Sequence, residues 1–268
     1  MRHLWLGILV GTMMLVACGD DDSDFATRPN GKESSSSISP KSSDSAARND
    51  GSEYDADKNT LTDLRDGQTY KTVTIGAQTW MAQNLNYAYI GVPYKYFGFT
   101  SDSISWCYDN DPANCTKYGR LYTWAAAMDS VGTWSTNGKS CGYRKACWPT
   151  YPVRGICPEG WHLPDSTEWN TLVTAVADSS TAGEMLKSSN GWNNSGNGTD
   201  AYFFSALPAG ICFPGGGFDE EGDAALFWSS AVFDRDNAYV IGMSCDYDFA
   251  RLLNHNKDLG FSVRCVKD

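Results

Sequence analysis

The sequence of 268 residues has little of what several classes of protein require. Only 20% of its residues are charged, and 21 Lys and Arg against 32 Asp and Glu give a formal net charge of −11. Nucleic-acid-binding proteins need a basic face for the phosphates, so this balance argues against that class. No run reaches the roughly 18 apolar residues that span a bilayer as a helix. Aromatic residues make up 13%, which is too many for a wholly disordered chain.

The motifs of common enzymes and metal sites are also missing. Three histidines, no Cys-x-x-Cys pair and no Gly-x-Ser-x-Gly turn argue against a zinc site and a Ser-His-Asp hydrolase. Gly215-Gly216-Gly217 lacks the Gly-Lys-Ser/Thr ending of a phosphate loop. A glycosidase pair of carboxylates stays open, because no pair stands out among the many acids. We expect His162 to be a satisfied structural histidine and His255 to lie in an exposed loop.

The first eighteen residues are typical of a bacterial lipoprotein signal. Arg2 and His3 precede an apolar stretch, Leu4 to Val16, that is too short to cross a membrane. Leu15-Val16-Ala17-Cys18 resembles a lipobox; an ordinary secretory signal with an incidental cysteine is the alternative. Residues 1–17 are then removed, and acyl chains on Cys18 anchor the protein stably. The sequence predicts a protein lipid-anchored to the outer membrane, on the cell surface.

Residues 18–59 are predicted to be the lipidated cysteine and a disordered linker rich in Ser and Asp, because apolar residues are too sparse to bury a core. About 40 such residues have an end-to-end distance of about 35 Å. The acidic beginning of the linker is either a sorting signal or a solvated spacer. Asp55-x-Asp57-x-Asn59 superficially resembles an EF-hand loop, but Thr60 stands where that loop requires Gly.

Residues 60–268 are long enough for one domain with a sizeable core, and their pattern predicts an α+β fold. Asp165-Ser166-Thr167-Glu168 is a capping box, and an apolar stripe at helical spacing follows it as far as Val176. A second stripe over Leu121, Trp124, Ala125 and Met128 predicts another helix, and a shorter one is expected near 184–187. The predicted strands are Thr69–Ile75, Thr79–Gln83, Phe227–Ala231, Ala238–Met243 and Phe261–Val266.

Eight cysteines remain after Cys18, an even number that suits an exported, disulfide-bonded domain. Eight cysteines allow 105 pairings, and the sequence does not choose among them. Spacing favours Cys107 with Cys115 and Cys141 with Cys147, each pair closing a small loop. Cys157 with Cys265 would tie the helical region to the last strand, which leaves Cys212 with Cys245.

Several separated segments occur in the order found in one known family. They are Asp66–Gly76, Gln78–Tyr87, Tyr118–Trp124, Cys157–Pro164, Phe227–Ser230 and Gly260–Cys265. Together, from about Thr62 to Asp268, they resemble the Fibrobacter succinogenes major paralogous domain family. The resemblance implies an exported, often lipid-anchored protein, and it brings no established molecular function.

The segment from Gly160 to Trp169, with the terminal Arg264-Cys265-Val266, is similar to C-type-lectin-like domains and to their formylglycine-generating enzyme branch. This similarity implies two main helices, short antiparallel sheets, long irregular loops, and ends joined by strands near Val73 and Val263. The enzymes of that branch use a reactive cysteine pair and copper. Only Cys245 and Cys265 lie in the corresponding region, and we assign both to structural disulfides.

Two aromatic segments are candidate ligand-binding loops. Tyr94, Tyr96 and Phe97 lie in a stretch broken by glycine and proline, and such rings stack well on sugars. The more ordinary interpretation is a meander that buries the rings. Phe213 and Phe218 flank the triple glycine. The acids that follow it are either a calcium site or a solvated loop. These four candidate metal ligands are Asp219, Glu220, Glu221 and Asp223.

These features predict a lipid-anchored binding module of the cell envelope, without catalytic activity and without a cofactor other than Ca²⁺. The expected ligand is a plant-type polysaccharide or another envelope component. The alternative is a structural lipoprotein that contacts other proteins. A formylglycine-generating type of enzyme is the third hypothesis.

Overall fold

The computed structural model describes residues 51–89 and 104–268, which belong to one compact unit, Ala46–Asp268. Helices and mostly antiparallel strands are mixed along this unit, so the predicted α+β class is confirmed. Cys18 and the aromatic candidates Tyr94, Tyr96 and Phe97 lie outside the described residues.

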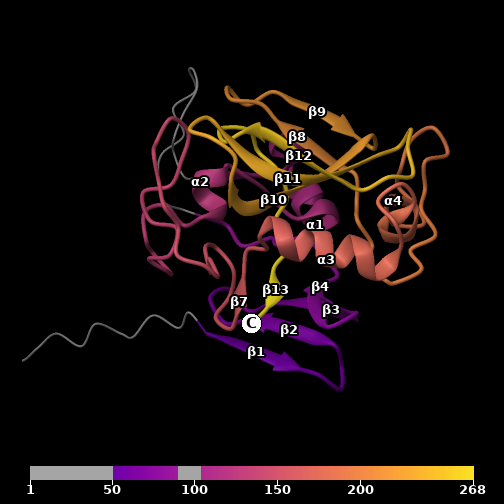
Figure 1. Cartoon of the computed structure of the whole chain (residues 1–268), viewed down its shortest axis with the longest axis horizontal. Coiled ribbons are helices and arrows are strands. Elements are labelled where there is room, and N and C mark those ends of the chain that lie inside the picture. Colours follow the sequence, from indigo (N-terminus) through magenta and orange to yellow (C-terminus); the bar gives the residue numbers. More distant parts are fainter. Residues whose placement is uncertain (1–50, 90–103) are drawn as a thin grey trace, which may run out of the picture. The chain divides into compact units, whose positions relative to one another are not determined.

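A six-stranded antiparallel sheet brings the beginning and the end of the domain together (Figure 1). Val266 near the C-terminus pairs with Trp80 on one side and with His162 on the other. The closing pair expected near Val73 and Val263 is therefore displaced, because Val73 pairs with Trp80 instead. In sheet order the strands are β1 Ser52–Asp55, β2 Thr60–Asp63, β3 Gln68–Ile75, β4 Gln78–Met81, β13 Val266–Lys267 and β7 Trp161–His162.

The predicted linker, residues 18–59, extends too far, because β1 lies within it and forms a hairpin with β2, the first strand of the predicted domain. Leu61 of β2 is fully buried in the core, and Asp63 and Arg65 form a fully buried ion pair of 2.6 Å. Asp55 forms an ion pair with Lys58 at 2.5 Å across the turn. A strand of four residues shows too little alternation of apolar and polar side chains to be predicted next to a segment rich in Ser and Asp.

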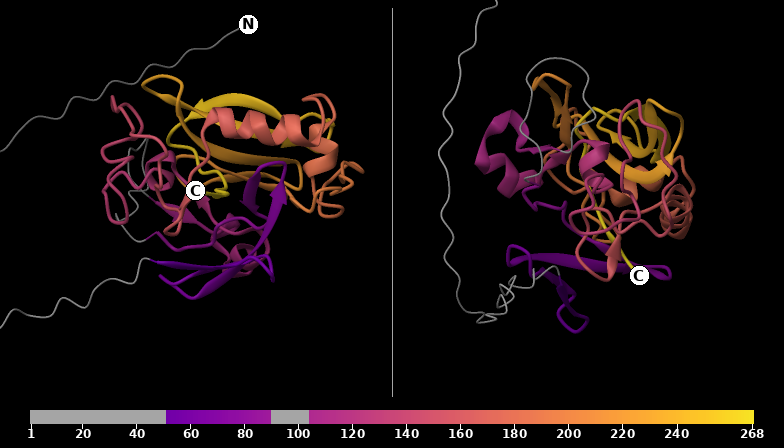
Figure 2. Two further views of the ribbon diagram at one scale, coloured as in Figure 1. Left: turned by 60° about the horizontal axis from the view of Figure 1, so that its bottom comes forward. Right: turned by 90° about the vertical axis from the view of Figure 1, so that its left-hand side faces the viewer.

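A three-stranded antiparallel sheet lies under the longest helix (Figure 2). Its strands are β10 Ala224–Val232, β11 Asn237–Ser244 and β12 Arg251–Asn256. Phe227 and Ile241 project from one face of this sheet and pack with Trp169 and Leu172 of α3, which spans Ser166–Val176. The capping box is confirmed, since Asp165 accepts from the Glu168 amide and Glu168 accepts from the Asp165 amide.

The second predicted helix is shorter than its stripe suggests. Leu121 lies in a strand, and the helix begins only at Trp124 because Thr123 caps it. No helix in the described part of the chain is long and apolar enough to cross a bilayer. The remaining elements are β5 Ser105–Trp106, η1 Tyr108–Asn110, α1 Pro112–Tyr118, β6 Leu121–Tyr122, α2 Trp124–Ala127, α4 Ala182–Leu186, β8 Ala209–Cys212 and β9 Phe218–Glu221.

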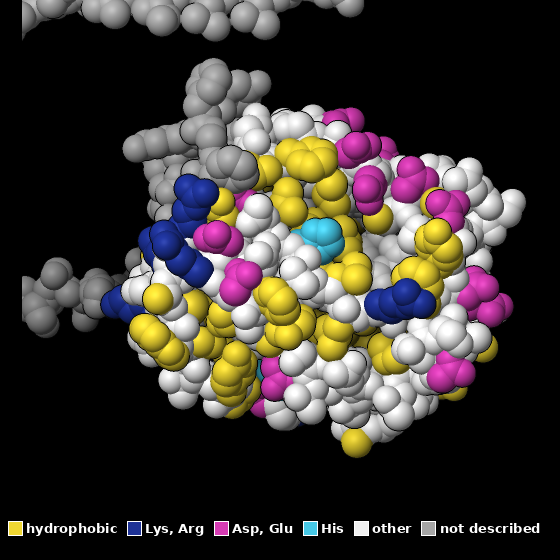
Figure 3. Space-filling view, turned by 45° about the horizontal axis from the view of Figure 1, so that its top comes forward, with side chains coloured by type: hydrophobic (Ala, Val, Ile, Leu, Met, Phe, Trp, Pro, Cys, Tyr) yellow, Lys and Arg dark blue, Asp and Glu magenta, His cyan; other side chains and the backbone are white. Residues whose placement is uncertain are grey.

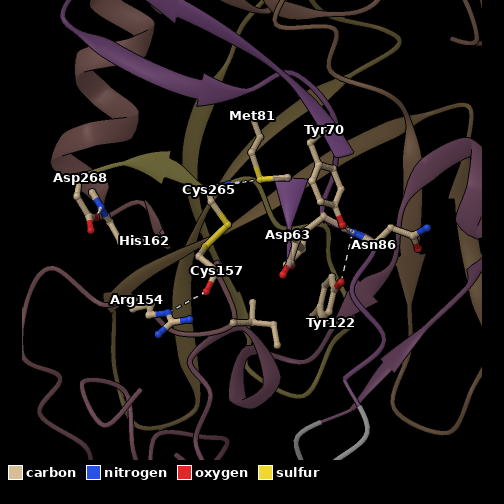
Figure 4. The surroundings of a disulfide bond; sticks show 12 residues. Asp63, Tyr70, Met81, Asn86, Tyr122, Arg154, Cys157, His162, Cys265 and Asp268 are labelled. Carbon is tan, nitrogen blue, oxygen red and sulfur yellow. Dashed lines mark hydrogen bonds and ion pairs between the residues drawn. A yellow bond between two sulfur atoms is a disulfide. The ribbon is translucent and has the colours of Figure 1, made fainter. Parts of the chain in front are cut away.

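Three disulfides confirm three of the pairings that spacing favoured: Cys107–Cys115, Cys141–Cys147 and Cys157–Cys265. The long Cys157–Cys265 bond lies in the core and joins the segment before β7 to the residue before β13 (Figure 4).

The pairing of Cys212 with Cys245 is wrong. Both are buried free thiols, and they pack in two different hydrophobic clusters. The Cys212 thiol faces the Phe213 carbonyl at 3.6 Å, whereas the Cys245 thiol donates to Asp223 at 3.3 Å. Burial raises the pKa of Cys212 to about 12, so this thiol stays protonated at neutral pH.

Candidate functional site

An apolar groove of about 410 Å³ is the candidate site, and it lies on the sheet face opposite α3. Side chains alternate between the two faces of a strand, so Ala224, Gly242 and Ser244 share the groove face. These three small residues leave the sheet surface hollow. A Cβ atom on Gly242 would lie 2.9 Å from Leu253 and 3.0 Å from Leu226, because these two leucines converge over it. Glycine at this floor position therefore lets the two leucine side chains approach the sheet backbone closely.

Exposed apolar side chains form the walls of the groove. Phe213 is 41% exposed, Leu253 39% and Tyr247 56%. Figure 3 looks onto this face and shows hydrophobic side chains gathered around a histidine, with a hollow beside it. Large apolar groups that meet at a hollow, rather than lying scattered, mark a site of interaction.

Tyr247 is held in place by a stack of side chains. Its ring lies on the Phe249 ring at a centroid distance of 4.9 Å with an interplanar angle of 20°. The Arg251 guanidinium lies 3.8 Å from the Phe249 centroid, a cation–π contact. Both partners cannot occupy one face of Phe249, so this ring is clamped between them. Tyr247 is 56% exposed, so its side chain is accessible to a ligand while the Phe249 ring holds its orientation.

Two ionisable groups line the groove. His255 lies in β12 and contacts the Phe261 ring edge to face at 5.4 Å. It is half-buried in a strand, so its expected position in an exposed loop is wrong. Burial lowers the pKa of His255, which leaves the imidazole uncharged at neutral pH. Burial, with Asp219 and Asp223 nearby, raises the pKa of Glu220.

The aromatic candidates around the triple glycine separate in the structure. Phe213 lies on the groove wall. Phe218 packs instead against Tyr108 at a centroid distance of 5.2 Å, in a cluster on the other side of the β8–β9 hairpin. Only one of the two predicted rings is therefore available to a ligand at this groove.

The four carboxylates proposed as calcium ligands are not brought together. Glu221 accepts from the Tyr118 hydroxyl at 2.8 Å and pairs with Lys117 at 3.2 Å. Asp223 accepts from Asn193 and from the Cys245 thiol, and Glu220 turns to the groove. Asp219 is exposed. Within residues 51–89 and 104–268, no three His, Cys, Asp or Glu side chains are placed to hold a metal ion.

His162 is a satisfied structural histidine, as predicted. Its Nδ1 lies 2.6 Å from Asp268 and its Nε2 lies 2.7 Å from Glu168, so it joins the start of α3 to the C-terminal residue (Figure 4). Burial opposes the charged form, but the hydrogen bonds to both carboxylates outweigh it and raise the pKa of His162. Both ring nitrogens are occupied, which leaves neither for catalysis.

A comparison with known protein families gives one match. Residues 73–267 match the Fibrobacter succinogenes major domain family. The chain belongs to this family. No curated protein and no solved structure gives a match. The family domain includes every residue of the groove and all three disulfides, whereas β1 and β2 precede it.

Sequence reasoning missed most of this family domain's groove. Tyr247, Phe249 and Leu253 were not singled out, although Tyr247 and Phe249 alternate with Asp246 and Asp248. Aromatic residues that alternate with acids, without the spacing of a helix, are a weak signal that the rings are exposed. The residues of the groove floor could not be predicted, because they depend on which residues face each other across strands.

Proposed function

We propose that this member of the Fibrobacter succinogenes major domain family is a non-catalytic binding module of the cell envelope. In this proposal Cys18 anchors it to the outer membrane at the cell surface, and the groove holds a segment of plant-type polysaccharide. The observation that carries the proposal is the Arg251–Phe249–Tyr247 stack, which presents the exposed Tyr247 side chain at an apolar groove.

Sugar recognition needs an apolar face and a few polar groups, and the groove offers both. The C–H face of a pyranose ring packs on an aromatic ring, and a ring fixed beforehand loses little entropy on binding. Glu220, Ser244 and the neutral imidazole of His255 are the polar side chains that could contact hydroxyl groups. A volume of about 410 Å³ is in the usual range for small-molecule sites.

A protein segment is the second candidate ligand. The lining is predominantly apolar, which also suits the side chains of an envelope protein. In that case the family domain is a structural or interaction lipoprotein, and the groove remains its contact surface. The two candidates differ in whether an isolated polysaccharide binds.

The cysteines support a non-catalytic module over a formylglycine-generating type of enzyme. Such chemistry needs two cysteines that work as a pair, and Cys265 is bonded to Cys157 in the core. Cys245 hydrogen bonds to Asp223, and burial together with that carboxylate raises its pKa, which disfavours the reactive thiolate.

We also propose that the fold is a distant variant of the C-type-lectin-like domain. Support comes from the terminal strand β13, which lies between β4 and β7, and from the long disulfide beside it. Superposition of an experimental structure on lectin-like domains tests this assignment. A different order of strands in the terminal sheet would contradict it.

Retention on insoluble polysaccharides tests the proposed ligand. The chain from Gly19 onward, without lipid, is mixed with cellulose, xylan, chitin and peptidoglycan, each with Ca²⁺ and with EDTA. Retention on one polymer is expected, and Tyr247→Ala should weaken it about tenfold, because stacking contributes about 0.5–1.5 kcal/mol beyond area burial.

The matched control is Phe203→Ala, which removes an aromatic ring that is 73% exposed and does not line the groove. This variant should bind like the unmodified chain. Absence of retention on all four polymers would contradict the polysaccharide proposal and leave a protein segment as the ligand.

A further inference from the structure

This acidic chain has two long segments without Asp or Glu, residues 67–101 and 130–158, and the second carries more bases. Between Asp129 and Glu159, residues 130–158 include no Asp or Glu and four bases. The bases are Lys139, Arg144, Lys145 and Arg154. The chain as a whole has a net charge of −11, so the segment forms a local positive region in a negative protein.

The same segment presents the most exposed large apolar side chain of the described residues. Trp148 is 86% exposed, and Tyr151 is 48% exposed three residues later. The Cys141–Cys147 disulfide closes the loop immediately before Trp148. A tryptophan held in the solvent by a closed loop is costly unless it contacts a partner, since burying such a ring is strongly favourable.

Three of the four bases in residues 130–158 are surface charges. Lys139, Arg144 and Lys145 are exposed, whereas Arg154 turns inward to the Trp134 carbonyl. Arg235 joins them from the β10–β11 turn, where its Nε donates to the Arg144 carbonyl at 3.2 Å. Figure 3 shows Lys and Arg gathered at the left edge of the molecule, on the side where Figure 1 places the loops between α2 and β7.

Acidic neighbours offset part of this charge. Asp236 lies 4.0 Å from Arg144, and Asp234 is in the same turn. Both carboxylates belong to the β10–β11 turn, so they do not interrupt the disulfide loop itself. We name the exposed set of Lys139, Arg144, Lys145, Trp148 and Tyr151 the cationic loop face. None of these residues lines the groove.

We propose that the cationic loop face is a contact surface for an anionic lipid bilayer. Trp and Tyr favour the boundary between headgroups and acyl chains, and Lys and Arg are attracted to anionic headgroups. Each base near such a surface strengthens binding about fivefold. At physiological salt the screening length is about 8 Å, so the loop responds to the membrane more strongly than to distant acids of the domain.

The position of the predicted anchor agrees with this partner. Thirty-three residues separate Cys18, the proposed anchor, from Ser52 in the sequence. A domain on a tether of that length meets the membrane often, and a weak contact then becomes effective. The loop face would orient the domain on the bilayer, so that the groove is presented in a defined direction.

Co-sedimentation with vesicles tests this inference on the unlipidated chain from Gly19. We expect binding to phosphatidylglycerol vesicles at 20 mM salt and its loss at 500 mM, with at least tenfold weaker binding to phosphatidylcholine. Trp148→Ala should weaken binding at least fivefold, and Lys139→Glu with Lys145→Glu should abolish it. Phe203→Ala is the matched control and should bind normally, and urea unfolding of each variant confirms that it is folded.

Two outcomes would overturn the inference: no binding to phosphatidylglycerol vesicles, and vesicle binding that Trp148→Ala leaves unchanged. If the chain binds soluble polygalacturonate but not vesicles, the cationic loop face is assigned to an acidic polysaccharide instead. Failure here is separate from failure of the groove, because Tyr247→Ala leaves the loop intact.

Discussion

Arg264 donates a hydrogen bond to the carbonyl oxygen of Phe204, and its guanidinium lies 4.4 Å from the centroid of the same residue's ring. The guanidinium is fully buried, and burial lowers the pKa of Arg264 to about 9. It also donates to the Ser205 carbonyl, the Asn84 side-chain oxygen and, at 3.5 Å, the Met81 carbonyl. One arginine therefore fastens the loop before β8 to the segment that follows β4.

Replacement of this arginine should be among the most damaging changes in the domain. Arg264→Met leaves buried oxygens of Phe204, Ser205 and Asn84 without their donor, so we expect a loss of about 3–5 kcal/mol in the free energy of unfolding. Urea denaturation measures it. Arg235→Met removes an exposed arginine and should change stability by less than about 0.5 kcal/mol. Equal losses in the free energy of unfolding for the two variants would show that the buried hydrogen bonds of Arg264 do not stabilise the domain more than an exposed arginine does.

The long disulfide should contribute more than a short one. In the chain-entropy model, closing the loop between Cys157 and Cys265, separated by 108 residues, stabilises by about 5 kcal/mol. The Cys107–Cys115 loop, with a separation of 8, is expected to contribute about 2–3 kcal/mol. Paired Cys→Ala variants, compared by urea denaturation, give the order. A larger loss for the short loop would contradict the model.

Asp258 should oppose folding at neutral pH. It is fully buried, both carboxylate oxygens lack hydrogen-bond partners among the described residues, and burial raises its pKa from 3.8 to about 6. The contribution of Asp258 to stability is fully present below the pKa that this group has in the unfolded chain. It is lost as the pH rises through the pKa of the folded state. From pH 4 to pH 7.5, the stability of Asp258→Asn relative to the unmodified chain should rise by up to about 3 kcal/mol.

The control for this experiment is Asp234→Asn. The Asp234 carboxylate accepts hydrogen bonds within its own turn, chiefly from the Asn237 side chain, which lower its pKa. It titrates below the range of the experiment, so the relative stability of this variant should not rise between pH 4 and 7.5. A flat profile for Asp258→Asn would mean that Asp258 has an ordinary pKa.

His162 should give a second pH dependence, in a higher window. Its folded pKa is raised above 6.5, so its contribution is complete below about pH 6.5 and is lost as pH rises through the folded value. The stability advantage of the unmodified chain over His162→Gln should therefore shrink from pH 6 to pH 9. NMR titration of the His162 ring measures the pKa directly. A value at or below 6.5 would refute the interpretation of the two carboxylate contacts.

Features that depend on residues close together in the sequence could be predicted, and features that depend on how strands pair could not. The capping box and stripe identify α3 because both signals lie within eleven residues of each other. The stripe through Leu121 misled, because an apolar residue in a two-residue strand happens to precede a cap at Thr123. The short disulfides follow from spacing, whereas the separation of Cys212 from Cys245 depends on which cluster each strand joins.

The groove shows the same limit. Phe213 was found because glycine marks an exposed turn. The rest of the groove combines the floor residues Ala224 and Gly242 with the wall residue Leu253, which three different strands bring together. A shift of one residue in either pairing would turn these side chains to the face under α3. The sequence of a single strand does not show which residues of the other strands share its face of the sheet.

Methyl NMR tests most directly whether the groove binds a polysaccharide. Leu226, Leu253 and Leu259 line the groove, whereas Leu61 and Leu163 are fully buried elsewhere. Six-sugar oligosaccharides of cellulose and xylan are titrated into the leucine-labelled chain from Gly19. If a polysaccharide binds in the groove, one of them shifts the methyl signals of the three groove leucines and leaves those of Leu61 and Leu163 unchanged. No shift with either oligosaccharide, or shifts confined to leucines outside the groove, would contradict it.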